Sequence, residues 1–137
     1  MSVTSQSSGE RTDRAEVELR VPADSAYASV LRTTTAGLAA RLDFTIDDIE
    51  DLRIAVGEAN AMVLEHADAG SDLLCRFHLA PGRMVVSVSV AAATQPVPDL
   101  DSFAWQVLTT LASEADISTA DGRFAIEMTM TSSAAGF

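Results

Sequence analysis

The amino-acid sequence predicts an α+β fold, a two-layer sandwich in which a mixed, mostly antiparallel sheet carries helices on one face. Three segments repeat apolar residues at steps of three and four, as amphipathic helices do. Five short segments alternate apolar and polar residues with the period of two that strands show. Tight turns join two pairs of these strands, which favours antiparallel neighbours. The predicted order is β, α, α, β, β, α, β, β.

The first strand and the first helix open the predicted domain. From Ala15 the sequence AEVELRV alternates apolar and charged residues, and Pro22 ends this strand. Asp24 or Ser25 can cap the helix that follows, in which Gly37 is the weakest position. The apolar stripe of this helix consists of Tyr27, Val30, Leu31, Thr34, Leu38 and Leu42. The spacing predicts a helix of about five turns.

The second helix has the clearest pattern in the chain. Thr45 precedes a first turn that contains Asp47 and Asp48, and such carboxylates suit the positive end of a helix dipole. The apolar stripe consists of Ile49, Leu52, Val56, Ala59, Val63 and Ala67. We therefore expect a long helix packed on the sheet.

The rest of the chain is predicted to form a hairpin, a third helix and a second hairpin. Apolar residues alternate with other residues in two segments, SDLLCRFHLA and MVVSVSV, on either side of a Pro-Gly-Arg turn. The stretch AAATQPVPDLD is predicted to be a loop, and Ser102 to Ser113 a helix, because Phe103, Val107 and Leu111 are spaced by four. The last two strands, 115–118 and 124–130, turn at Asp121-Gly122.

Composition limits the possible functions. The 137 residues contain 20 Asp and Glu against 9 basic residues, all of them arginine, and the net charge is −11. Without lysine, the chain cannot use a P-loop phosphate lysine, a Schiff base or the strand lysine of eukaryotic-type protein kinases. The negative charge repels nucleic-acid backbones and anionic membranes, so we expect neither as a direct partner.

Length and local composition predict one domain with short tails. We expect the domain at residues 15–131, a disordered tail at 1–14 and a C-terminal tail at 132–137. Cys75 is the only cysteine, and no signal sequence or long apolar run is found, which indicates a cytoplasmic protein. Cys75 and His78 should face opposite sides of a strand, so no metal site is expected.

The second helix contains the phrase DLRIAVGEANAMVLEHA, which together with the element order resembles anti-sigma factors of the RsbW and SpoIIAB type, in a divergent, actinobacterial-like form. That family typically reads AVxEAxxNAxxHA, and residues Ala55, Val56, Glu58, Ala59, His66 and Ala67 stand at matching places. The resemblance covers residues 15 to 131 and implies the histidine-kinase-like ATPase fold. It also implies two activities: sequestering a stress-type sigma factor, and phosphorylating a serine on an anti-anti-sigma partner, a STAS-domain antagonist, with ATP and magnesium.

The magnesium and adenine positions of that family are changed here. The asparagine that contacts magnesium, four residues after the family glutamate, is replaced by Met62, whose thioether is a poor magnesium ligand. Asn60 cannot replace it, because two residues turn roughly 200° around a helix. The adenine-binding aspartate of the D-x-G-x-G motif falls on Val90 or Ala92.

The phosphate-binding glycines are changed as well. The G-x-G that opens the next helix beneath the phosphates falls on Ser102-Phe103-Ala104, and only Gly122 matches a late family glycine. Side chains thus stand where glycines would admit phosphates. We expect Met62, Ser102, Ala104 and Gly122 to mark a mostly degenerate nucleotide site, with no bound cofactor.

Other side chains have both a functional and a structural interpretation. Glu58 matches the family's catalytic base, or is a solvated carboxylate. Arg32 matches an arginine that the family uses against partner proteins, or is a solvated helix residue. His66 is expected to interact with the helix dipole, and Trp105 and Phe103 to pack in the core.

Three functional hypotheses remain. The first is an anti-sigma factor that is a homodimer, as its family is, and that an anti-anti-sigma antagonist releases from its sigma factor. The second is an active ATP-dependent serine kinase that acts on this antagonist. The third is a different signalling partner without sigma binding. Under the first hypothesis, the charge of −11 would steer the chain toward a basic, DNA-binding sigma factor.

Overall fold

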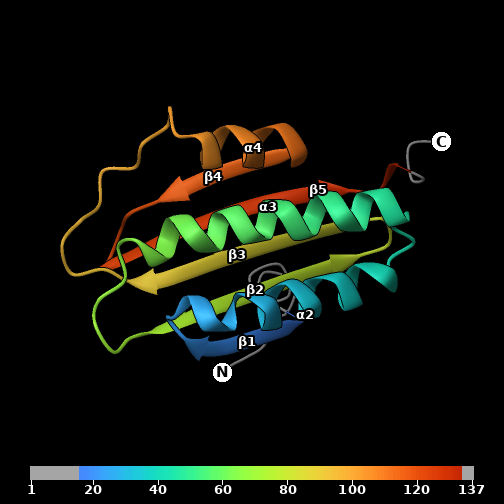
Figure 1. Ribbon diagram of the computed structural model, residues 1–137. Helices are drawn as coiled ribbons and strands as arrows, with labels where there is room; N and C mark the ends of the chain where they lie inside the picture. Colours follow the sequence, from blue (N-terminus) through green and yellow to red (C-terminus); the bar gives the residue numbers. More distant parts are fainter. Residues whose placement is uncertain (1–15, 134–137) are drawn as a thin grey trace, which may run out of the picture.

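A computed structural model describes residues 16–133 and confirms the α+β sandwich: its three α-helices lie on one face of a five-stranded sheet (Figure 1). The strands are β1 (Val17–Pro22), β2 (Asp72–Ala80), β3 (Arg83–Ala91), β4 (Glu114–Ser118) and β5 (Arg123–Thr131), and the helices are η1 (Ser25–Tyr27, a 3-10 turn), α2 (Ala28–Ala40), α3 (Ile46–Leu64) and α4 (Phe103–Leu111). The sheet order is β1-β2-β3-β5-β4. All four pairings are antiparallel, so the described sheet contains no parallel pair where the sequence predicted a mixed sheet.

The register of the sheet lines up its apolar residues across all five strands. Leu19, Cys75, Val88, Ile126 and Ile117 are successive cross-strand partners in one row. The three members on the central strands are fully buried. Because side chains alternate along a strand, this row faces the helices and its sequence neighbours face the other side. The core therefore lies between the sheet and the helical layer.

Two hairpin turns join β2 to β3 and β4 to β5. Gly82 has φ 69° in the first turn, and Asp121 and Gly122 have φ 58° and 72° in the second. Two consecutive positive φ values are typical of the type I′ turns that suit the twist of paired strands. Both predicted turns are therefore confirmed.

Helix α3 lies over the centre of the sheet, between α2 and α4 (Figure 1). Its start is a capping box: Asp48 N donates to Thr45 Oγ1 at 3.1 Å, and Thr45 N donates to the Asp48 carboxylate at 3.2 Å. Leu52, Val56 and Val63 of the predicted stripe are fully buried. The position of α3 allows its two sides to face different neighbouring helices.

The ends of the folded region differ slightly from the predicted domain. The Asp48 carboxylate also accepts hydrogen bonds from the backbone N and the hydroxyl of Ser133, at 2.9 and 3.0 Å. These contacts lie two residues past the predicted domain end at residue 131. The predicted tail at 1–14 lies outside the described residues, as do residues 134–137. No helix among residues 16–133 has the length and apolarity of a membrane span.

Two details of the helical predictions were wrong. The first helix begins as the 3-10 turn η1, capped by Asp24, and leaves Tyr27 and Val30 exposed at 38% and 41%. Phe103 is 78% exposed, although its spacing predicted a core position. In α4 the buried side instead runs through Ala104, Leu108 and Ala112, which share the same spacing of four. Small residues allow α4 to approach α3 closely, so the buried side is rotated away from Phe103.

Candidate functional site

A cavity of about 310 Å³ lies where the C-terminal half of α3 faces the start of α4. It brings together three of the predicted nucleotide-site residues, Met62, Ser102 and Ala104. The other lining residues are Glu65, His66, Val97, Pro98, Asp99 and Phe124. The size is at the lower end of the range typical of small-molecule pockets.

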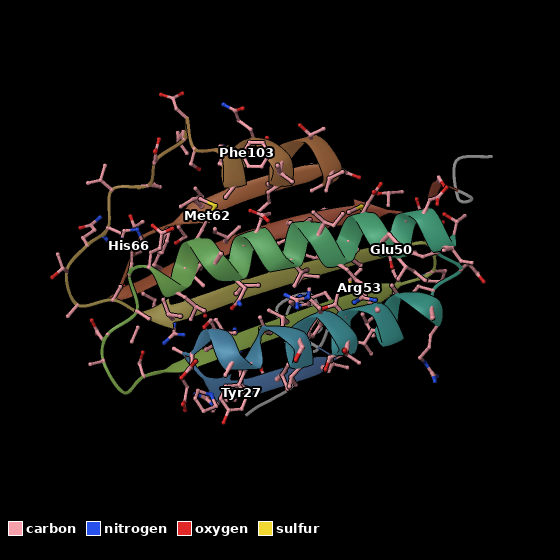
Figure 2. All side chains as sticks on the ribbon, in the orientation of Figure 1. Tyr27, Glu50, Arg53, Met62, His66 and Phe103 are labelled. Atoms are coloured by element: carbon pink, nitrogen blue, oxygen red, sulfur yellow. The ribbon has the colours of Figure 1, made fainter. Side chains whose placement is uncertain are left out.

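Met62 and His66 line the cavity from the end of α3, together with Glu65. Met62 is 7% exposed and lies on the side of α3 that faces α4 (Figure 2). One turn later, the ring of His66 packs edge-on against Phe124, with ring centroids 5.2 Å apart and an interplanar angle of 85°. The Met62 thioether, a poor magnesium ligand, therefore lines the cavity.

The first turn of α4 is closed by its own residues. The Ser102 hydroxyl accepts from the backbone N of Trp105 at 3.1 Å, and the Ser102 backbone N donates to the Asp99 carbonyl at 3.2 Å. The Asp99 carboxylate in turn accepts from Asp101 N at 2.9 Å. The backbone N of Trp105, one of the first-turn donors that a helix start can offer to a phosphate, is thus already bonded to Ser102, and the Asp99 carboxylate places negative charge at this helix start.

The cavity lining carries more acidic than basic side chains. Glu65 and Asp99 contribute two carboxylates, and no arginine is among the lining residues. A triphosphate would meet these charges without a compensating cation in the wall. Val90 and Ala92, at the expected adenine-binding positions, are buried at 0% and 2% exposure and offer no carboxylate. The cavity lining therefore contains neither an arginine nor a side-chain amide.

Two predicted residues lie outside the cavity. Glu58 is half-buried one turn before Met62, and it makes no hydrogen bond or ion pair with any residue of the described range 16–133. Gly122 is exposed, and its carbonyl accepts from Ala92 N at 2.8 Å, which fastens the end of β3 to the start of β5. Gly122 therefore supports the turn that precedes Phe124.

Arg32 lies on the opposite side of α3, on α2. Its side chain packs against α3 at Gly57. If Gly57 carried a Cβ atom, that atom would lie 3.6 Å from Arg32 Cδ and 3.8 Å from Arg32 Nη1. Arg32 is half-buried, and its guanidinium pairs with no carboxylate in the part of the chain that the structure describes.

Asn60 is 4% exposed, does not line the cavity and has no hydrogen-bond partner for Oδ1. The prediction that Asn60 cannot replace Met62 agrees with this position.

Sequence reasoning did not place six of the nine lining residues in the cavity. His66 was expected only to interact with the helix dipole, although it follows Met62 by four residues, just past the end of α3. Glu65, the C-cap of α3, follows Met62 by three residues, a spacing that places both on one side of the helix. Asp99 and Phe124 gave no signal, because their approach depends on how the loop and β5 meet α3. Cys75 is fully buried, and burial raises the pKa of its thiol to about 12. Within residues 16–133, no three His, Cys, Asp or Glu side chains gather closely enough to hold a metal ion.

Comparison with curated proteins shows similarity to serine-protein kinases named RsbW. The chain is 46% identical over 74 residues to RsbW of Halalkalibacterium halodurans, covering 53% of this chain and 46% of that protein. It is 38% identical over 76 residues to RsbW of Bacillus subtilis, covering 53% and 48%. The chain thus spans about half the length of the curated relatives it matches, and no family model matches it. The resemblance found in the sequence is confirmed.

Solved structures support the same fold. A crystal structure of the RsbU and RsbW domains of Rv1364c from Mycobacterium tuberculosis aligns with a TM-score of 0.63 at 21% identity, over 84% of this chain and 32% of that one. The histidine kinase domain of the blue-light activated kinase EL346 from Erythrobacter litoralis aligns with a TM-score of 0.55 at 12% identity, over 81% and 61%. The histidine-kinase-like fold is therefore confirmed.

Proposed function

We propose that this chain is an anti-sigma factor that sequesters a stress-type sigma factor in the cytoplasm, without using ATP, and is released by an anti-anti-sigma antagonist. The similarity to RsbW proteins supports the choice of partners. The observation that carries the proposal is the cavity between α3 and α4, which contains residues predicted for the nucleotide site but offers Met62, Glu65 and Asp99 where a nucleotide would need an amide oxygen and cations.

Arg32 is the proposed partner contact. Its guanidinium is held against Gly57 but pairs with no carboxylate among the described residues, so it can bind a partner's carboxylate in a bidentate manner. The strongly negative charge of the chain would increase the rate of encounter with a basic sigma factor. We therefore expect association to slow as salt rises, and a salt-independent rate would remove the electrostatic part of the proposal.

The proposal is tested by co-purifying the full chain with candidate sigma factors. We expect one of them to be retained by the wild type and lost with Arg32→Glu. Gly37→Ala, on the same helix but without contact to Arg32, is the matched control and should retain it. Retention of no sigma factor by the wild type would contradict the proposal. We also propose a homodimer, and sedimentation equilibrium of the free chain would test it.

The second candidate function is the serine kinase, which the names of the relatives favour. Calorimetric titration with Mg-ATP separates the two candidates, because we expect no heat of binding at micromolar nucleotide. A radiolabelled phosphate transfer assay on the antagonist adds a second readout. Phosphate transfer by the wild type that is lost in Glu58→Ala would establish the kinase and refute the degenerate site.

A further inference from the structure

Strand β4 forms one edge of the sheet and lies beside an apolar groove. β4 pairs with β5 only, so its outer edge has no strand partner within residues 16–133. A groove of about 330 Å³ runs along this edge, with Ala115 and Ile117 of β4 on one side and Leu100 and Trp105 on the other. An unpaired strand edge exposes backbone N–H and C=O groups that a further extended segment can bond.

The same region exposes large apolar side chains. Leu100 is 57% exposed and Val97 is 88% exposed, in the loop that leads into α4. Trp105, one turn into α4, is half-buried and lines the groove. Exposed aliphatic side chains beside a partly open tryptophan are typical of sites where another chain is bound.

Charge indicates what kind of chain can bind. Between residues 97 and 122 every ionisable side chain is a carboxylate, and these are Asp99, Asp101, Glu114, Asp116 and Asp121. Asp116 contributes to the groove lining, and alternation along β4 directs its side chain to the other side of the sheet, together with that of Glu114. A second copy of this chain, paired edge to edge through β4, would place Glu114 and Asp116 against the same two carboxylates. Like charges facing each other across a strand pair are destabilising, which disfavours self-association at this edge.

We propose that the β4 edge binds an extended segment of a partner protein that alternates basic and apolar residues and adds to the sheet as a sixth strand. Because side chains alternate across a strand, one set would point toward Trp105 and Ile117 and the other toward the side of the sheet that carries Glu114 and Asp116. The apolar set would fill the groove, and the basic set would pair with the carboxylates. This proposal does not depend on the identity of the partner proposed above.

Trp105 is the only tryptophan in the sequence, so its fluorescence reports on the groove directly. The full chain is titrated with a short capped peptide of alternating arginine and valine. A second peptide with glutamate in place of arginine tests charge, and a third, with proline in place of the central valine, tests strand addition because proline lacks a backbone N–H. We expect the first peptide alone to shift the emission of Trp105 and the amide signals of residues 114–118.

Charge reversal at the edge provides the decisive comparison. Asp116→Lys should weaken binding of the arginine peptide by about tenfold, since an exposed attraction becomes a repulsion. Glu18→Lys changes the net charge equally on the other edge strand, β1, and should leave binding unchanged. Equal affinity for Asp116→Lys and wild type, equal binding of the proline peptide, or amide shifts outside β4 and the groove would each overturn the proposal.

Discussion

Replacing Asp48 by alanine should destabilise the fold more than any other single change in the exposed acidic turn of α3. The Asp48 carboxylate accepts from Thr45 N at 3.2 Å and from the backbone N and hydroxyl of Ser133 at 2.9 and 3.0 Å, so it connects the start of α3 to the chain beyond β5. Losing the Asp48 half of the capping box, the hydrogen bond from Thr45 N, costs about 1 kcal/mol. The hydrogen bonds from Ser133 to the charged carboxylate add about 1.5 kcal/mol. This is the low end of the range for hydrogen bonds to charged groups, and we use it because Ser133 is exposed. We expect a total of about 2–3 kcal/mol.

Asp47 provides the matched control for this measurement. It lies in the same first turn but accepts no hydrogen bond within residues 16–133, so Asp47→Ala removes only the interaction with the helix dipole, about 0.5 kcal/mol. The free energy of unfolding of both variants is measured by urea denaturation followed by far-UV circular dichroism at pH 7. If Asp48→Ala falls within about 0.5 kcal/mol of Asp47→Ala, the proposed connection between α3 and Ser133 contributes nothing measurable.

The contribution of Asp48 should also depend on pH. Burial acts to raise the pKa of Asp48, but hydrogen bonds from Ser133 and Thr45 outweigh it and hold the pKa below its ordinary value of 3.8. A carboxyl with a lowered folded-state pKa stabilises the fold fully above its unfolded pKa and loses this effect as pH falls through the folded value. The difference between wild type and Asp48→Asn should therefore be constant from about pH 5 to 8 and shrink below about pH 4. A difference that grows on acidification would refute the reasoning.

Four further outcomes are expected. Gly37→Ala should raise the free energy of unfolding by about 0.5–1 kcal/mol in urea denaturation, because a Cβ there meets nothing within 4 Å and alanine favours helix. Phe124→Ala should cost about 3–5 kcal/mol and Phe103→Ala less than about 0.5 kcal/mol in the same assay, since they are 1% and 78% exposed. Cys75, with a pKa of about 12 against an ordinary 9.0, should react with iodoacetamide on the order of a thousandfold more slowly in the native state than in urea. Met62→Asn should not restore Mg-ATP binding in calorimetry, because Glu65 and Asp99 still face the cavity.

Much of the fold could be predicted because its signals are local. The Thr45 cap, the alternation of β2 and β3 and the Asp121-Gly122 turn each depend on a few neighbouring residues, and each has its predicted place. Phe103 was misplaced for a non-local reason. The stripe of Phe103, Val107 and Leu111 and the stripe of Ala104, Leu108 and Ala112 have equal spacing. The second stripe is the buried one, because its two alanines allow α3 and α4 to pack closely.

The candidate site was predictable in part for the same reason. Met62, Ser102 and Ala104 were found through the family motif, which fixes positions along the chain. The role of Asp99 depends on the folding of the loop, which brings its carboxylate to the cavity and its carbonyl to Ser102 N. No spacing rule connects a loop residue to a helix three elements earlier, so the strongest electrostatic obstacle to a nucleotide is visible only in three dimensions.

The two sides of α3 explain how partner binding could persist without a nucleotide. Met62 faces α4 and the cavity, whereas Gly57 faces α2 and supports Arg32. Leu52, Val56 and Val63, packed on the sheet between these sides, keep both in place whether or not the cavity is occupied. Because the core holds the α2 and α3 surface in place, Arg32 can contact a partner without bound ATP. If sigma binding uses this surface and the chain binds no ATP, release does not depend on nucleotide turnover in this chain, and we expect an antagonist to compete for the same α2 and α3 residues.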